Sequence, residues 1–324
     1  MAKKSKKKKH NINKWYNNEE GVRNAGYDDS QYFDINTEEG QKNILQMQKS
    51  MKDPIYFIEN FVKVRILDDS LSESDNGRII NIKLRDYQKD IIKNVLNERF
   101  LIFMLARQCG KTSTISMTYL WYLLFEDNYN ILVLANEHSK AKEIITELKT
   151  MYENLPFWIQ VGVKKYNENE IVFENGSRIV AKATTKKSGR GGTWNVVYVD
   201  EMAFIPENII EDFMKSSFST VTSGKTSKFI VTSTPQGRNY FWKMYNNAKS
   251  GDSEFKALFY PWYENPNYDE KFKEKIINTF GERFFRREYE CVGENTFINI
   301  YDKIEKKYLK IKIGDFYKMC ENEN

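Results

Sequence analysis

The sequence predicts an α/β fold in which a mostly parallel sheet carries helices on both faces. Four short runs are almost entirely apolar, at 100–105, 130–135, 196–199 and 228–232. Each run is followed by a longer stretch with the apolar spacing of an amphipathic helix. Strands buried on both faces have such continuous apolar runs, and their alternation with helices is typical of a parallel sheet.

The other elements follow in order along the chain. Apolar residues at helical spacing predict helices over 85–96, 111–125, 139–152, 208–218 and 240–248. Asn175 and Gly176 separate two short runs and predict a hairpin. Two helices broken at Gly281 are expected over 269–290, followed by short β-like runs. The chain thus divides into a basic polar arm (1–50), a core (51–255), a helical lid subdomain (256–290) and a small β-rich appendage (291–324).

The positive charge of the chain resides mostly in its N-terminal arm. The 324 residues carry a net charge of +5 from 50 basic and 45 acidic side chains, and six of the lysines lie within the first nine residues. The charges of the remaining residues nearly cancel, so the folded body is not a strongly basic nucleic-acid binder. We expect the arm to be solvated and mobile, with a weak electrostatic hold on DNA phosphate as the alternative.

Composition excludes several further classes of protein. A membrane span needs about 18 consecutive apolar residues, and the sequence has no such run. Three widely spaced cysteines, Cys109, Cys291 and Cys320, indicate reduced intracellular thiols rather than a disulfide framework or a zinc site. Only two histidines are present, which excludes chemistry built on several histidines.

A phosphate-binding loop is predicted between the first apolar run and its helix, where the sequence is A-R-Q-C-G-K-T at 106–112. A helix that begins there offers free N–H groups to a phosphate. Gly110 lets the backbone approach closely, Lys111 reaches the β- and γ-phosphates, and the Thr112 hydroxyl binds Mg²⁺. Leu105 replaces the usual first glycine of the motif. An ordinary helix start is the alternative, but the preceding buried strand favours the phosphate loop.

Two carboxylates, Asp200 and Glu201, end the third apolar run. In ATPases with a phosphate loop, the aspartate at this position coordinates Mg²⁺, and an adjacent glutamate orients and deprotonates the attacking water. A helix-capping Asp-Glu pair is the alternative. Taken with the loop, the pair predicts a P-loop NTPase of the RecA/ASCE-like kind that uses ATP and Mg²⁺.

The fourth run ends in hydroxyl side chains at 232–234, followed by a proline. These hydroxyls are in a position to contact the γ-phosphate or the attacking water and to pass the nucleotide state to the rest of the protein. The alternative is a strand end that is simply stopped by proline.

Four motifs in this order resemble the large terminase subunit of tailed phages. They are Tyr87-Gln88, the loop at 106–112, V-V-Y-V-D-E-M-A-F-I at 196–205 and T-S-T-P-Q-G-R-N-Y-F-W at 232–242, within a resemblance that covers about residues 50–290. The family member is the ATP-driven motor that moves double-stranded DNA into a procapsid. By resemblance, Gln88 recognises adenine with Tyr87 nearby, and Ser233 and Thr234 form the coupling motif.

The resemblance also implies roles for residues in two glycine-containing loops. Gln108 belongs to the nucleotide-binding loop, and Arg107 in the same loop senses the γ-phosphate in cis. Arg190, in S-G-R-G-G at 188–192, matches an arginine that acts on a neighbouring subunit. Either arginine would stabilise charge in the transition state. A basic, glycine-rich surface loop is the alternative for Arg190.

The same resemblance implies partners and a location. The expected partners are double-stranded DNA, a portal protein, a small terminase subunit and further copies of the chain in a ring of about five. The expected place is the cytoplasm of the infected bacterium, transiently on the procapsid. A nuclease domain follows the ATPase in this family, and the short segment after Glu290 leaves no room for one. We therefore expect ATP hydrolysis without DNA cleavage.

The segment 291–324 resembles the start of an intein, and of a split one if a second polypeptide carries the nuclease half. It opens with Cys291, has Thr296 five residues on, and contains I-G-D-F at 313–316. The resemblance implies that Cys291 attacks the carbonyl of Glu290 and forms a thioester. The T-x-x-H block of inteins is missing, and a degenerate linker with an ordinary cysteine is the alternative.

Two other functions stay open at this point. A helicase would share Tyr87-Gln88 and the Asp-Glu pair, although it needs a second RecA-like lobe. The chain could instead be an inactive precursor whose role is to be joined to its other half by trans-splicing.

Overall fold

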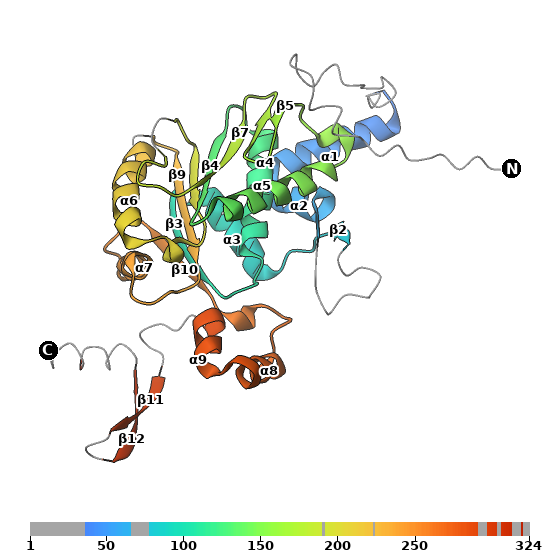
Figure 1. Ribbon diagram of the computed structural model, residues 1–324. Coiled ribbons are helices and arrows are strands. Elements are labelled where there is room, and N and C mark those ends of the chain that lie inside the picture. Colours follow the sequence, from blue (N-terminus) through green and yellow to red (C-terminus); the bar gives the residue numbers. More distant parts are fainter. Residues whose placement is uncertain are drawn as a thin grey trace.

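A computed structural model of the chain describes residues 36–65, 78–189, 192–222, 224–290, 297–302, 306–312 and 319. Its centre is an eight-stranded sheet with the order β10-β3-β9-β8-β4-β7-β6-β5 (Figure 1). The strands are β3 (Phe100–Leu105), β4 (Asn130–Ala135), β5 (Val163–Tyr166), β6 (Glu170–Phe173), β7 (Arg178–Ala183), β8 (Val196–Val199), β9 (Lys228–Ser233) and β10 (Lys256–Tyr260). The four predicted apolar runs are β3, β4, β8 and β9, which lie together in the middle of the sheet.

The sheet is mostly parallel, which confirms the predicted fold class. Strands β10, β3, β9, β8, β4 and β7 pair in parallel, whereas β6 pairs antiparallel with both β7 and β5. The predicted hairpin joins β6 to β7, and Gly176 adopts the left-handed φ of 83° that this turn requires. Strand β5 was not predicted, because its Val-Lys-Lys-Tyr sequence has little apolar character.

Helices cover both faces of the sheet, as expected. Side chains alternate along a strand, so Leu101, Phe103 and Leu105 of β3 face one hydrophobic core. Helices α3 (Asp86–Asn97), α4 (Lys111–Phe125) and α5 (His138–Glu153) contribute to that core. Phe100 and Ile102 face the opposite core, which α6 (Glu207–Thr222) and α7 (Tyr240–Ser250) complete (Figure 1).

Helix α1 (Glu38–Lys52) is longer than the short helix expected within the arm, and the proposed domain boundary at residue 50 falls inside it. Thr37 caps its N-terminus, and its other end contacts the core because Trp121 Nε1 of α4 donates a hydrogen bond to the Ser50 carbonyl at 2.8 Å. Helix α2 (Pro54–Phe61) packs against both α1 and α4. A small antiparallel pair, β1 (Lys63–Arg65) and β2 (Ile79–Asn81), follows.

A helical subdomain follows β10. It consists of α8 (Glu270–Phe280), α9 (Glu282–Phe285) and a π-helical turn, η7 (Arg286–Glu290), with the predicted break at Gly281. Further on, β11 (Phe297–Asp302) and β12 (Lys307–Lys312) form the small C-terminal antiparallel hairpin, which stands apart from the sheet in Figure 1. No described helix is both long and apolar enough to cross a membrane.

Candidate active site

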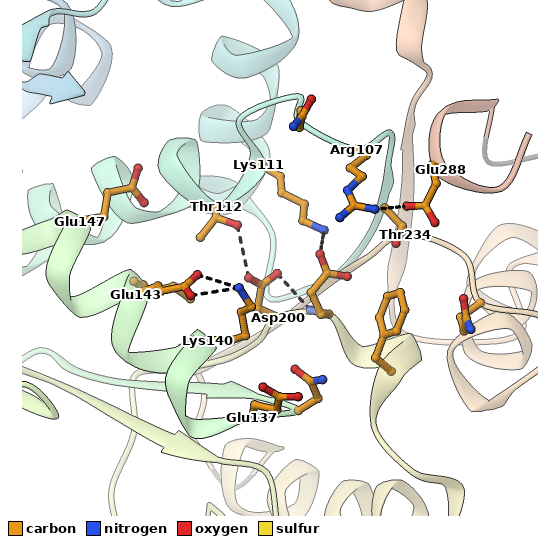
Figure 2. A pocket seen from close by; sticks show the side chains of 16 residues that line it. Arg107, Lys111, Thr112, Glu137, Lys140, Glu143, Glu147, Asp200, Thr234 and Glu288 are labelled. Carbon is orange, nitrogen blue, oxygen red and sulfur yellow. Dashed lines mark hydrogen bonds and ion pairs between the residues drawn. The ribbon is translucent and has the colours of Figure 1, made fainter. Parts of the chain in front are cut away.

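A cavity of ≈ 780 Å³ lies at the carboxyl ends of the central parallel strands, where α/β sheets commonly bind ligands. Its lining comes from the loop after β3, the start of α4, one side of α5, the end of β8, the loop after β9 and η7 (Figure 2). The lining residues are Arg107, Gln108, Lys111, Thr112, Asn136, Glu137, Lys140, Glu143, Ile144, Glu147, Asp200, Glu201, Phe204, Thr234, Gln236 and Glu288.

The loop between β3 and α4 has the backbone of a tight anion-binding turn. Gly110 is the N-cap of α4 and adopts a left-handed φ of 65°, and Gln108 is left-handed as well, at 57°. Such a φ is costly for a residue with a Cβ, so the surrounding contacts must hold Gln108 in place. Lys111 is the first helical residue, which puts the free N–H groups and the positive end of the α4 dipole beside the cavity.

The loop faces the carboxylates that follow β8. Lys111 Nζ lies 2.5 Å from Glu201 Oε1, and the Thr112 hydroxyl donates to Asp200 Oδ2 at 3.3 Å (Figure 2). These two segments are about 90 residues apart in the chain, and they meet because parallel strands end at the same edge of a sheet. The structure therefore brings together the ammonium, the hydroxyl and both carboxylates that the sequence singled out.

Asp200 is held by its own strand and by the next one. Its Oδ1 accepts a hydrogen bond from the Thr232 hydroxyl at 2.7 Å and another from the Glu201 amide at 3.0 Å. The buried Tyr198 hydroxyl lies 2.9 Å from that of Thr232, and burial raises the pKa of Tyr198 well above its usual value. Glu201 differs, because its Oε2 is buried and has no hydrogen-bond partner among the described residues.

The hydroxyls after β9 play different parts. Ser233 Oγ is fully buried, accepts from the Ala203 amide at 3.1 Å and donates to the Thr234 carbonyl at 2.8 Å. It thereby ties the end of β9 to the turn that follows Glu201. Thr234 lines the cavity itself.

Tyr87 and Gln88 lie behind the loop, and neither belongs to the described lining of the cavity. The Tyr87 hydroxyl donates to the Cys109 carbonyl at 2.9 Å, and Gln88 Nε2 donates to the Thr114 hydroxyl at 3.1 Å. Both side chains thus contact the phosphate loop and α4. Their expected contact with adenine stays a prediction.

Arg107 is fastened to the helical subdomain by two hydrogen bonds. Its guanidinium contacts the Glu288 carboxylate at 3.0 Å, and its amide donates to the Glu288 carbonyl at 2.8 Å (Figure 2). The Glu288 side chain is only 9% exposed, whereas that of Arg107 is 56% exposed. The sequence did not single out Glu288, since 181 residues separate it from Arg107 and no local pattern links the two.

Helix α5 contributes a polar stripe that was also missed. Glu137, Lys140, Ile144 and Glu147 follow one another at intervals of three or four residues, which places them on one face of the helix toward the cavity. Burial, and to a lesser degree the nearby Asp200 carboxylate, raise the pKa of Glu147 against a hydrogen bond from Ser113. Charges at helical spacing directly after a central strand were the signal that could have identified them.

The remaining site predictions fall elsewhere. Cys109, inside the loop, is 2% exposed, and burial raises the pKa of its thiol to about 11. Arg190 and Cys291 lie outside the described residues. Within the described ranges, no group of three His, Cys, Asp or Glu side chains is arranged to hold a metal ion.

Comparison with known proteins agrees with this geometry. Residues 102–305 match the family described as terminase large subunit, T4likevirus-type, N-terminal. The HK97 bacteriophage large terminase has a TM-score of 0.59 at 18% identity, over 76% of this chain and 56% of that one. The large terminase ATPase domain of Thermus phage P74-26 has a TM-score of 0.52 at 18% identity, over 65% and 100%.

A third similar structure is the large terminase of a thermophilic bacteriophage in complex with ADP. Its TM-score is 0.51 at 18% identity, over 64% of this chain and 52% of that one. At these identities the three structures show a shared fold. The present chain spans little more than half of the HK97 protein and of this third terminase.

Proposed function

This chain belongs to the T4-like family of large terminase subunits, and we propose from that premise that it hydrolyses ATP to drive double-stranded DNA into a procapsid. The observation that carries the proposal is the placement of Lys111 and Thr112 opposite Asp200 and Glu201 at one edge of the sheet. Structures of the large terminase from the thermophilic phage contain ADP or ATP-γ-S, which supports a nucleotide as the ligand of the equivalent cavity here.

In this proposal the triphosphate lies along the N-terminus of α4. The free N–H groups of the loop and the Lys111 ammonium bind its phosphates. Lys111 is now paired with Glu201, so binding of the phosphates draws the ammonium away from that carboxylate. Arg107 can then compensate charge on the γ-phosphate, and Arg190 is proposed to act on a neighbouring subunit.

The residues present suit a magnesium ion. Mg²⁺ prefers oxygen ligands and commonly binds through one or two carboxylates and the substrate phosphates, rather than in a cage of protein side chains. Thr112 and Asp200 supply such oxygens 3.3 Å apart, and the absence of a three-residue metal cluster in the described part of the chain fits this mode. The ion would neutralise charge on the phosphates.

Glu201 is proposed as the residue that orients the attacking water and takes its proton. A buried carboxylate oxygen without a hydrogen-bond donor is costly, and Glu201 Oε2 is such an atom in the described structure. A water molecule between Glu201 and the γ-phosphate would satisfy it. Thr234 lines the same space and is proposed, with Ser233, to report the nucleotide state to α7.

The proposed partners are double-stranded DNA, a portal protein, a small terminase subunit and other copies of this chain in a ring. The proposed place of action is the cytoplasm of the infected bacterium, on the procapsid. The neutral body of the chain supports transient rather than permanent contact with DNA.

ATPase measurements on the wild type, Lys111→Ala and Glu201→Gln test this function. We expect each variant to lose about a hundredfold or more in turnover, because each removes a group that acts on the transition state. Lys142→Ala is the matched control, since Lys142 pairs with Glu168 away from the cavity. An unchanged rate in Lys111→Ala would refute the phosphate-loop assignment. Strand separation of a tailed duplex would instead favour a helicase.

We also propose that the segment after Glu290 is the N-terminal part of an intein. The β11–β12 hairpin supports a β-rich structure for it. The chain would be mixed with a polypeptide carrying an intein C-terminal half and a marker protein, and the products weighed. Ligation that is lost in Cys291→Ala is the expected result, and ligation that survives this substitution contradicts the proposal.

A further inference from the structure

We propose that Tyr87 and Gln88 are positioning residues that hold the phosphate loop in its binding conformation, and that they do not read the nucleotide base. This inference rests on the proposed function, since it assumes that the cavity binds a nucleoside triphosphate. It departs from the adenine contact that the sequence resemblance implies. Three observations carry it: the bonds of Gln88, the backbone of the loop and the contact between Gln88 and Gly110.

The amide of Gln88 is already engaged at both ends. Its Oε1 accepts a hydrogen bond from the Arg85 amide at 3.0 Å, and its Nε2 donates to the Thr114 hydroxyl at 3.1 Å. The residue is 6% exposed and is not part of the described cavity lining. A glutamine reads an adenine edge with one donor and one acceptor together, and here both groups are committed to protein atoms.

The loop needs such support because of its backbone. Gln108 and Gly110 both have left-handed φ values, and a non-glycine residue persists there only when its surroundings hold it. Tyr87 fixes the carbonyl of Cys109, which lies between these two residues, through its hydroxyl at 2.9 Å. Gln88 fixes Thr114, one turn into α4. The first turn of α3 thus holds the loop at two points, from the side opposite the cavity.

Gln88 also sets the space available at Gly110. A Cβ added to Gly110 would lie 3.2 Å from Gln88 Nε2, so the loop backbone is in close contact with this amide. Helix α3 packs against α4, as Figure 1 shows, so the contact is between two fixed elements. The consequence is general: loss of Gln88 should weaken binding of any triphosphate, with or without a base.

The experiment measures the affinity of the full chain for three probes by calorimetry in the presence of Mg²⁺: ATP-γ-S, GTP-γ-S and inorganic triphosphate, which has no base. The variants are Gln88→Ala and Gln88→Glu. The glutamate keeps the acceptor for Arg85 and loses the donor to Thr114. We expect both variants to bind all three probes about tenfold more weakly, by the same factor for each, since one buried hydrogen bond is lost.

Three further variants complete the design. Thr114→Val deletes the partner of Gln88 from within α4 and should reproduce the same uniform loss, without an added loss in the double variant with Gln88→Ala. Tyr87→Phe removes a single hydroxyl and should also weaken all three probes. Gln160→Ala is the matched control, because Gln160 donates to the carbonyls of Tyr152 and Leu155 far from the cavity.

The outcomes separate the two proposals. A loss confined to ATP-γ-S, with inorganic triphosphate unchanged, overturns the positioning role and restores adenine recognition. Unchanged affinity for all three probes in Gln88→Glu overturns it as well. If the wild-type chain binds none of the three probes, the proposed ATPase function fails instead. Should Gln88→Ala not fold, the single-atom change in Tyr87→Phe decides the same question.

Discussion

The phosphate loop and the acidic end of β8 face each other across the cavity, but they are supported in different ways. The loop is supported by peripheral segments, with Tyr87 and Gln88 on one side and Glu288 on the other. Asp200 is supported from within the sheet, by Thr232 on the neighbouring strand. One wall of the site is therefore as rigid as the sheet, while the other depends on α3 and η7.

This difference indicates where nucleotide binding can cause movement. Packed parallel strands resist displacement, so Asp200 should keep its position whatever occupies the cavity. Arg107 is tied through both its backbone and its side chain to η7, a π-helical turn of the kind that often marks functional positions. A guanidinium that turns toward a phosphate must loosen its contact with Glu288. The helical subdomain is thus the part of the chain most directly exposed to the state of the nucleotide.

The largest effect is expected from breaking the rigid wall. Thr232→Val keeps the shape of the side chain but removes the donor to Asp200 Oδ1. Residues that support metal ligands commonly change metal affinity by about ten- to a hundredfold. We expect the Mg²⁺ concentration for half-maximal ATPase to rise by that factor. Thr118→Val, in the buried part of α4, is the control, because Thr118 donates to a helical carbonyl instead. An unchanged Mg²⁺ dependence would refute the rigid support of Asp200.

A smaller effect is expected from the mobile wall. Glu288→Gln removes the charge that competes with a phosphate for Arg107, and such partly exposed ion pairs contribute about 0.2–1 kcal/mol. The preference for ATP-γ-S over ADP should therefore rise about two- to fivefold. Binding titrations of both nucleotides test it. Glu282→Gln is the matched control on the same subdomain, since Glu282 pairs with Arg286. A ratio unchanged in Glu288→Gln speaks against competition for the arginine.

The smallest effect concerns the anchoring of α3 at its far end. Lys228, at the start of β9, donates to the carbonyls of Leu96 and Glu98 at 2.8 Å, and burial lowers its pKa to about 8. The pKa of an unfolded lysine is about 10.4. Between about pH 8 and pH 10 the unfolded chain thus holds the extra proton, and the free energy of unfolding rises with pH by at most about 1 kcal/mol per unit.

Urea unfolding at several pH values in this window measures that slope. Lys228→Met should give a flatter dependence on pH, because it removes the titrating group. Above about pH 10 the comparison ends, since tyrosines ionise in the unfolded chain, whereas burial raises the pKa of Tyr260 in the folded one. Equal slopes for wild type and variant would show that Lys228 does not titrate in this window.

Much of the fold was predictable because its strands are buried on both faces. The apolar runs of β3, β4, β8 and β9 need no long-range information to be recognised, and the order of helices between them predicts a parallel sheet. Strand β5 and most of α1 escaped prediction because their apolar residues are few. Their places depend on contacts with distant segments, such as that between Trp121 and Ser50.

The site was predictable only where its residues adjoin a strand end. Lys111, Thr112, Asp200 and Glu201 follow central strands directly, so the parallel topology alone brings them to one edge. Glu288 enters from a segment that pairs with the loop across 181 residues, and no local pattern announces such a contact. The case of Gln88 is different: its motif was recognised, but a motif does not tell which side of the loop the side chain occupies.

Cys109 gives the loop a property that concerns oxidation rather than binding. A thiol becomes reactive as the thiolate, and this one is 2% exposed with its pKa raised to about 11, so at neutral pH it stays protonated and shielded. The sulfur atom beside the phosphates is therefore poorly accessible to peroxides and alkylating agents. Chemical labelling of cysteines in this chain should leave the loop unmodified until the fold itself opens.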